Sequence, residues 1–168
     1  MAKNGIGKVD PYRSFNFTLS ITDANGNNFQ SAGFESISGM KADIDDIEYR
    51  EGGDSTHTKH YPGLTKYDKL TCQRGMTEDM DIANWFAQIS KINGDGSFNP
   101  LRKNGQIFLW NASHTIIQTS WTIQEMWISS YETDTFDAKS SGIAIEKMVI
   151  THNGFERDQN PTPSNVNA

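Results

Sequence analysis

His57 and His60 are the residues whose type and spacing come nearest to a metal site. Two histidines three positions apart can begin a zinc site, but no further Cys or His pair stands at a supporting spacing. The segment that begins at Asp23 resembles a calcium loop, yet its sixth position is Asn28 instead of glycine and its twelfth is Phe34 instead of glutamate. We therefore expect no metal and no cofactor, and interpret the segments as a solvated loop and a turn.

Signatures of catalysis are also missing. The chain has no G-x-S-x-G elbow, no P-loop and no paired cysteine motif. Asp and Glu are abundant, with 21 in total, but none falls into a recognisable acid–base pair. Cys72 is the single cysteine, which excludes an intrachain disulfide and is typical of a reducing compartment. We expect a buried strand position for Cys72, and a protein that is not an enzyme.

Composition narrows the class of protein further. A length of 168 residues favours one domain, and the net charge of −6 without a basic patch argues against binding to nucleic acid or anionic membranes. The first eight residues lack the apolar centre of a signal peptide. No run of about 18 apolar residues is present, so we expect no membrane-spanning helix.

Alternation of apolar and polar side chains predicts a mainly β fold. Between residues 15 and 21 the alternation is strict, which is the period of a half-buried strand, and the Asn-Gly pair at 25–26 signals a hairpin turn. In a later strand that starts near residue 41, the parity of the apolar residues changes across Asp45 and Asp46, which predicts a β-bulge. About seven strands are expected.

One amphipathic helix is predicted over about residues 77–93, with Thr77 as its N-cap. Its apolar stripe recurs at helical spacing and comprises Ile82, Trp85, Phe86, Ile89 and Ile92. The predicted strands and helix therefore form a small antiparallel β-barrel or sandwich with one flanking helix. We assign residues 1–10 to a flexible arm, 11–155 to this single domain and 156–168 to a tail.

Four stretches are more specific than composition. They cover residues 10–17, 33–40, 47–77 and 145–155, and the third holds the runs Glu-Tyr-Arg-Glu-Gly-Gly from Glu48 and Pro-Gly-Leu-Thr-Lys-Tyr from Pro62. Together they resemble the tail tube family of contractile phages, R-type pyocins and phage-like contractile injection systems, over about residues 10–155. One minor departure is Lys59-His60-Tyr61, where the family often has a basic residue directly before Pro-Gly.

This resemblance implies a β-barrel subunit, six copies of which form a ring. The rings stack into a tube inside a contractile sheath. Its implied partners are itself, the sheath, a spike or baseplate adaptor, and a tape-measure protein or cargo in the lumen, with no membrane anchoring. The implied location is the cytoplasm during synthesis and then a tail-like particle, released or attached to an envelope. The resemblance fits a phage, a pyocin or a dedicated injection system equally. It also fits either the main tube or a ring next to the baseplate.

Matched by motif, a long protruding hairpin is expected to stack on the neighbouring ring; an ordinary exposed hairpin is the alternative. Its residues are Ile47, Glu48, Tyr49, Arg50, Glu51, Gly52, Gly53, Tyr61, Pro62, Gly63, Lys66 and Tyr67.

Two strand faces carry small polar residues without charge. Their members are Asn16, Thr18, Ser20, Gln118, Ser120, Thr122 and Gln124. A face washed by solvent usually carries more Lys and Glu, so we hypothesise that part of these faces lines the lumen, with plain solvent exposure as the alternative.

A rival function rests on the strand tryptophans Trp110, Trp121 and Trp127. Exposed on one face, they would form the stacking platform of a carbohydrate-binding β-sandwich module. Core packing or subunit contact is the other interpretation of these side chains. The two functions predict different behaviour, because a sugar-binding module is monomeric and a tube protein forms rings or filaments.

Overall fold

The computed structural model describes residues 11–23, 28–53, 57–91, 101–136 and 142–158, and of residues 28–32 the backbone only. The expected arm 1–10, the turn at 25–26, Ile92 and most of the expected tail lie outside the described residues. The described chain is mainly β, as predicted, with ten strands instead of about seven and one α-helix. The strands are β1 Phe17–Thr22, β2 Asn28–Ala32, β3 Ser36–Ser38, β4 Ala42–Tyr49, β5 Lys59–Tyr67, β6 Leu70–Gly75, β7 Lys103–Trp110, β8 Ile117–Thr133, β9 Ile145–Thr151 and β10 Gly154–Asp158; the helix is α1 Asp81–Ser90.

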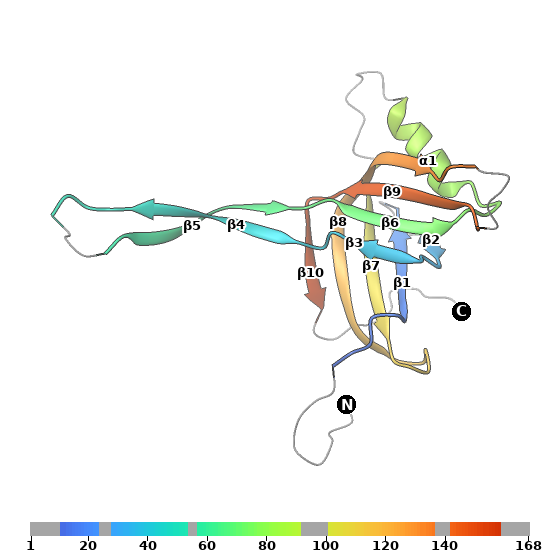
Figure 1. Ribbon diagram of the computed structural model, residues 1–168, viewed down its shortest axis with the longest axis horizontal. Coiled ribbons are helices and arrows are strands. Elements are labelled where there is room, and N and C mark those ends of the chain that lie inside the picture. The colour runs from blue at the N-terminus through green and yellow to red at the C-terminus, as the bar shows by residue number, and fades with distance from the viewer. Residues whose placement is uncertain (1–10, 24–27, 54–56, 92–100, 137–141, 159–168) are drawn as a thin grey trace, which may run out of the picture.

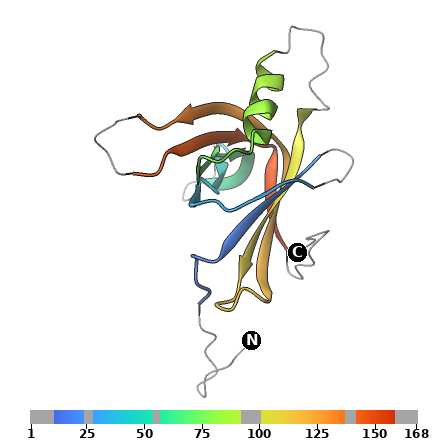
Figure 2. The ribbon, with the colours of Figure 1, turned by 90° about the vertical axis from the view of Figure 1, so that its right-hand side faces the viewer.

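Eight of the strands form one sheet in the order β2-β1-β7-β8-β9-β6-β3, with β10 paired to β8. The long strand β8 divides this sheet into two layers: its first half pairs with β7 and β10, and its second half pairs with β9. Between the halves, Glu125 has a φ of 51°, which bends the strand. Figures 1 and 2 show the two layers crossing at this bend. We call β2, β1, β7, the first half of β8 and β10 the first layer.

The sheet is open in the described part of the chain. Its end strands β2 and β3 do not pair with each other there, so the described residues take the sandwich-like form of the prediction and do not close into a barrel. The core lies between the layers. Its buried side chains include Leu19, Ile21, Leu70, Cys72, Ile107, Ile123, Met126, Ile128, Met148 and Ile150.

Helix α1 covers one end of the core (Figure 2), and its stripe points inward as predicted. Ile82 and Trp85 are buried, and the indole of Trp85 donates a hydrogen bond of 2.8 Å to the carbonyl of Leu101. No helix in the described residues is long and apolar enough to cross a membrane.

The predicted helix start at Thr77 is wrong, because two local turns precede the helix. The Thr77 hydroxyl accepts the N–H of Asp79 at 3.3 Å, and the Asp79 carboxylate accepts the N–H of Asp81 at 3.0 Å. These side-chain contacts compete with helical hydrogen bonds, so the helix begins at Asp81. Thr77 is therefore not the N-cap.

Strands β4 and β5 form a separate two-stranded hairpin that projects far from the rest of the domain (Figure 1). Its register shifts between Ile44 and Asp46, which confirms the predicted bulge. The bulge crowds the opposite strand: a Cβ on Gly63 would lie 2.9 Å from the carbonyl oxygen of Asp45. Glycine at this position therefore lets the two backbones come close together.

Residues 156–158, which the sequence analysis places in the tail, belong to β10 and pair with β8. Their polar side chains are satisfied across the sheet: Arg157 donates to the Thr119 hydroxyl at 3.0 Å, and Asp158 accepts from the Ser120 hydroxyl at 2.8 Å. Polar contacts of this kind leave no pattern of hydrophobic residues in the sequence. The segment was therefore expected to belong to the tail.

Candidate assembly surfaces

The projecting hairpin has one apolar face. Side chains alternate along each strand and paired residues share a face, so the register places one set of residues on the same side. We call the large hydrophobic members of this set the apolar hairpin face: Ile44, Ile47, Tyr49, Tyr61 and Tyr67. Each of its side chains is between 39% and 61% exposed. Ala42, Lys59 and Thr65 lie on the same side. The bulge keeps Ile44 and Ile47 on the same side, although they are three positions apart.

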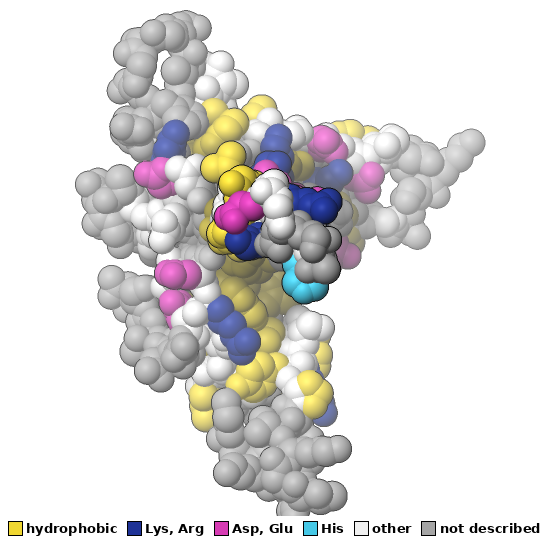
Figure 3. Space-filling model, turned by 90° about the vertical axis from the view of Figure 1, so that its left-hand side faces the viewer, with side chains coloured by type: hydrophobic (Ala, Val, Ile, Leu, Met, Phe, Trp, Pro, Cys, Tyr) yellow, Lys and Arg dark blue, Asp and Glu magenta, His cyan; other side chains and the backbone are white. Residues whose placement is uncertain are grey.

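The opposite side of the hairpin is mostly charged. We call it the polar hairpin face: Asp43, Asp45, Asp46, Glu48, His60, Pro62, Leu64 and Lys66. Lys66 pairs with Asp45 at 2.7 Å, and the His60 ring lies 2.7 Å from Asp46. Figure 3 views the molecule from the tip of the hairpin. Hydrophobic and charged side chains are both visible on this side of the molecule.

This ribbon cannot be explained as a free-standing element. An isolated two-stranded hairpin is marginally stable in water, and a contiguous exposed apolar face usually marks an interaction surface. Of the residues predicted for stacking, Ile47, Tyr49, Tyr61 and Tyr67 lie on the apolar face. Glu48, Pro62 and Lys66 lie on the polar face, Gly63 faces the bulge, and 50–53 follow the end of β4 at the tip.

An aromatic cluster fixes the root of the hairpin. The ring of Tyr67 lies 5.7 Å from Phe155 and 5.8 Å from His152, and His152 lies 6.0 Å from Phe155. His152 is buried. Its role could not be predicted from the sequence, because a single histidine directly after a strand carries no periodic signal.

The two small polar strand faces come together on one side of the first layer. Thr18, Phe108, Ser120 and Asp158 form one cross-strand row, because their strands pair in that register. The next row contains Ser20, Gln106, Thr122 and Glu156. We call this side the polar sheet face. It also holds Asn16, Gln118 and Gln124 by alternation, and it lies opposite the core residues Leu19 and Ile107.

Hydrogen bonds tie this face together. Asp158 accepts from the hydroxyls of Ser120 and Thr122 at 2.8 and 3.0 Å, and Gln106 donates to Thr122 at 3.2 Å. Of the predicted residues, Gln124 is exposed, Ser20 and Ser120 are buried and the others are half-buried. The two described rows carry the carboxylates of Glu156 and Asp158 and no Lys or Arg.

The tryptophans do not form a platform. Trp85 is buried, and Trp110, Trp121 and Trp127 are half-buried. Trp110 stacks on His114 with ring centroids 4.7 Å apart, and its indole donates to Thr18 at 2.9 Å. Trp121 packs against the core. The carbohydrate-binding reading is therefore not favoured.

An ionic network centred on a buried arginine joins β6, β8 and β9 to Asp79, which precedes α1. The Arg74 guanidinium pairs with Glu146, and it also reaches the Asp79 carboxylate at 3.3 Å. The Tyr131 hydroxyl donates to Glu146 at 2.6 Å. Burial first, and then this hydrogen bond, raise the pKa of Tyr131 to about 12. Every member of this network has a partner, so we assign it a structural role.

Comparison with known proteins gives one family. The family described as T4-like virus tail tube protein gp19 matches residues 13–156. No curated protein sequence matches the chain.

Solved structures share the fold. A chain from the cryo-EM structure of the anti-feeding prophage cap, a tube-terminating cap, has 22% identity and a TM-score of 0.75, over 92% of this chain and 95% of that one. A chain from the sheath-tube complex of the extracellular contractile injection system PVC, in its extended state, has 23% identity and a TM-score of 0.73, over 88% and 91%. A chain from the anti-feeding prophage baseplate has 18% identity and a TM-score of 0.74, over 89% and 97%.

Proposed function

Because this chain belongs to the family of the T4-like virus tail tube protein gp19, we propose that it is the structural subunit of a hollow tube built from stacked six-membered rings. The apolar hairpin face carries this proposal. Its five large side chains remain between 39% and 61% exposed, although Tyr67 packs against Phe155 and His152 at the root of the ribbon. Packing this face on a subunit of the next ring removes it from water and holds the rings in register.

Rings close through sheet edges. In the described residues β2 pairs only with β1, and β10 only with β8, so the first layer has two open edges. An open edge offers unpaired N–H and C=O groups, and a ring of copies joined edge to edge satisfies them. A heterologous interface whose rotation closes produces such a ring. In this arrangement the polar sheet face turns to the lumen.

A lumen of this composition suits transport. Hydroxyl and amide side chains that already bond to Asp158 and to each other offer cargo few strong contacts. The role is therefore mechanical, with no covalent step. We propose as partners other copies of the chain, a sheath, a spike or baseplate adaptor, and a tape-measure protein or cargo. The chain is made in the cytoplasm and acts in a tail-like particle.

The decisive experiment compares the two hairpin faces. Ile47→Asp places a carboxylate on the apolar hairpin face, whereas Leu64→Asp places the same group on the polar hairpin face, where the native side chain is 75% exposed. Burying one Ile side chain contributes about 1.5–3 kcal/mol, and a tube repeats the loss at every subunit. Size-exclusion chromatography and negative-stain electron microscopy are expected to show rings or rods for wild type and Leu64→Asp, but not stacked rods for Ile47→Asp. Intact rods from Ile47→Asp would overturn the proposal.

A further inference from the structure

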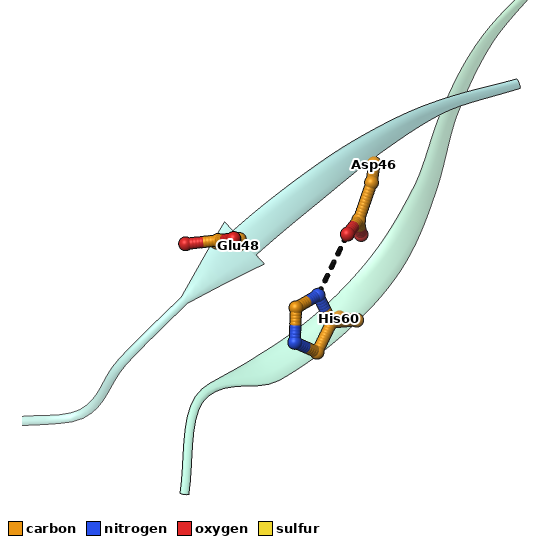
Figure 4. A group of neighbouring side chains, drawn as sticks. All are labelled: Asp46, Glu48 and His60. Atoms are coloured by element: carbon orange, nitrogen blue, oxygen red, sulfur yellow. Dashed lines mark hydrogen bonds and ion pairs between the residues drawn. The ribbon is translucent and has the colours of Figure 1, made fainter.

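Three potential metal ligands meet on the polar hairpin face. Glu48 and His60 are direct cross-strand partners, and Asp46 precedes Glu48 by two positions, so all three point to the same side. One ligand atom from each of them lies within 4.8 Å of the other two. Figure 4 shows the carboxylate of Asp46 turned to the imidazole of His60, with Glu48 beside them.

We propose that Asp46, Glu48 and His60 bind one divalent transition-metal ion of the Zn²⁺ class. Zinc bonds to nitrogen and carboxylate oxygen are about 2.0–2.2 Å long, which places the ligand atoms of a tetrahedral site roughly 3.4 Å apart. The 2.7 Å contact between Asp46 and His60 therefore has to widen, and Glu48 has to approach. Both movements need only side-chain rotation, because all three residues are exposed.

The imidazole determines the class of ion. Carboxylates alone attract Mg²⁺ and Ca²⁺, whereas an imidazole nitrogen favours Zn²⁺ and its neighbours in the transition series. Three protein ligands also leave a coordination position for water or for a further ligand. This combination separates the site from an ordinary group of surface acids.

Charge on the same face supports the assignment. Asp43 pairs with Lys41 at 2.5 Å, and Asp45 pairs with Lys66 at 2.7 Å. Within the described residues, Glu48 has no lysine or arginine partner and lies beside a second carboxylate, that of Asp46. A divalent cation at this point neutralises both carboxylates, and it leaves the imidazole free to bind as a neutral ligand.

Binding cross-links β4 to β5 beyond the bulge. The hairpin pairs with no other strand of the described chain, so a bond network between its strands stiffens the ribbon along its outer half. The site is complete within one chain, and it does not depend on the proposed tube.

The test uses the full-length chain, at a concentration at which it is monomeric, with ZnCl₂ in isothermal titration calorimetry. We expect one ion per chain for the wild type and a loss of affinity of about tenfold or more for His60→Ala, since even outer-sphere changes cost about 10–100-fold. Glu48→Gln is expected to weaken binding in the same direction. His57→Ala is the matched control, because it removes a nearby exposed histidine and leaves the three ligands in place.

Circular dichroism confirms that each variant is folded, which is expected because every substituted side chain is exposed. Absence of Zn²⁺ binding by the wild type, equal binding by His60→Ala, or an equal loss in His57→Ala would overturn the site. Full competition by equimolar Mg²⁺ would overturn the assignment of the ion class. None of these readouts depends on ring formation, so they separate this inference from the tube proposal.

Discussion

The ring of Tyr67, the last residue of β5, lies 5.8 Å from the ring of His152, the residue directly after β9. This contact joins the projecting hairpin to the body of the domain. Neither ring nitrogen of His152 makes a well-formed hydrogen bond with the described residues, although the backbone of Asp68 and Gly154 favours its protonated form. The root of the hairpin is therefore a buried, titratable contact.

Acid is expected to destabilise the domain through His152. Burial lowers the pKa of His152 from its ordinary 6.5. As the pH falls through 6.5, the unfolded chain takes up a proton that the folded chain does not, so the free energy of unfolding decreases until the pH passes the folded pKa. The slope is at most about 1.4 kcal/mol per pH unit for one proton. Urea unfolding at several pH values between neutral and acidic measures it.

The matched variants for this prediction are His152→Phe and His57→Gln. Phenylalanine keeps an aromatic ring against Tyr67 and removes the titration, so the pH slope is expected to flatten. His57 is exposed, and its replacement is expected to leave the slope unchanged. An unchanged slope in His152→Phe would exclude His152 as the source.

Breaking the buried ionic network is expected to be costly. Arg74→Met leaves the Glu146 carboxylate buried beside Tyr131 without its guanidinium, and such a loss costs about 3–5 kcal/mol. The double variant Arg74→Met with Glu146→Leu removes both charges and is expected to be more stable than Arg74→Met alone. Chemical denaturation of wild type, both single variants and the double variant gives the coupling energy. A double variant as unstable as the sum of the singles would contradict the direct pairing.

The fold could be predicted wherever apolar residues recur at the spacing of a strand or of a helix. The bulge at Asp45 and Asp46 followed from a change in apolar parity, and the helix stripe followed from spacing. The start of the helix could not be predicted in this way, because side chains in the turns before it compete for its hydrogen bonds. Strand β10 could not be predicted either, because its polar side chains bond to partners distant in sequence. Asp158, which bonds to Ser120 and Thr122, is the clearest case.

The candidate assembly surfaces could be located in part for the same reason. The hairpin residues expected to stack were chosen by their resemblance to a family, but their division into two faces required the register across the bulge. The two polar strand faces were visible as separate patterns, and only the pairing of β1, β7 and β8 showed that they form one surface. The sequence singled out His60, but only together with His57; its position beside Asp46 and Glu48 comes from the pairing of β4 with β5 and matches no linear metal motif.

Gly63 is expected to control the shape of the hairpin. A Cβ at this position would lie 2.9 Å from the carbonyl oxygen of Asp45 and 3.2 Å from the Ile47 side chain, so Gly63→Val forces β4 and β5 apart at the bulge. We expect chemical-shift changes throughout the hairpin and few in the core. Gly52→Val is the control, because nothing lies within 4 Å of a Cβ there. Equal effects of the two substitutions in heteronuclear NMR spectra would contradict the argument.

The orientation of the polar sheet face can be determined by labelling a single thiol. Cys72 is fully buried and burial raises its pKa to about 12, so the native cysteine is expected to resist maleimide reagents and to give no background. Gln124→Cys places an exposed thiol on the polar sheet face, and Gln88→Cys places one on the exposed side of α1. In tubes assembled from maleimide-gold conjugates of each variant, electron microscopy is expected to show gold on the tube axis for Gln124→Cys and on the outer wall for Gln88→Cys. Gold on the outer wall for Gln124→Cys would mean that the polar sheet face is turned away from the lumen, even if the rings and their stacking are as proposed.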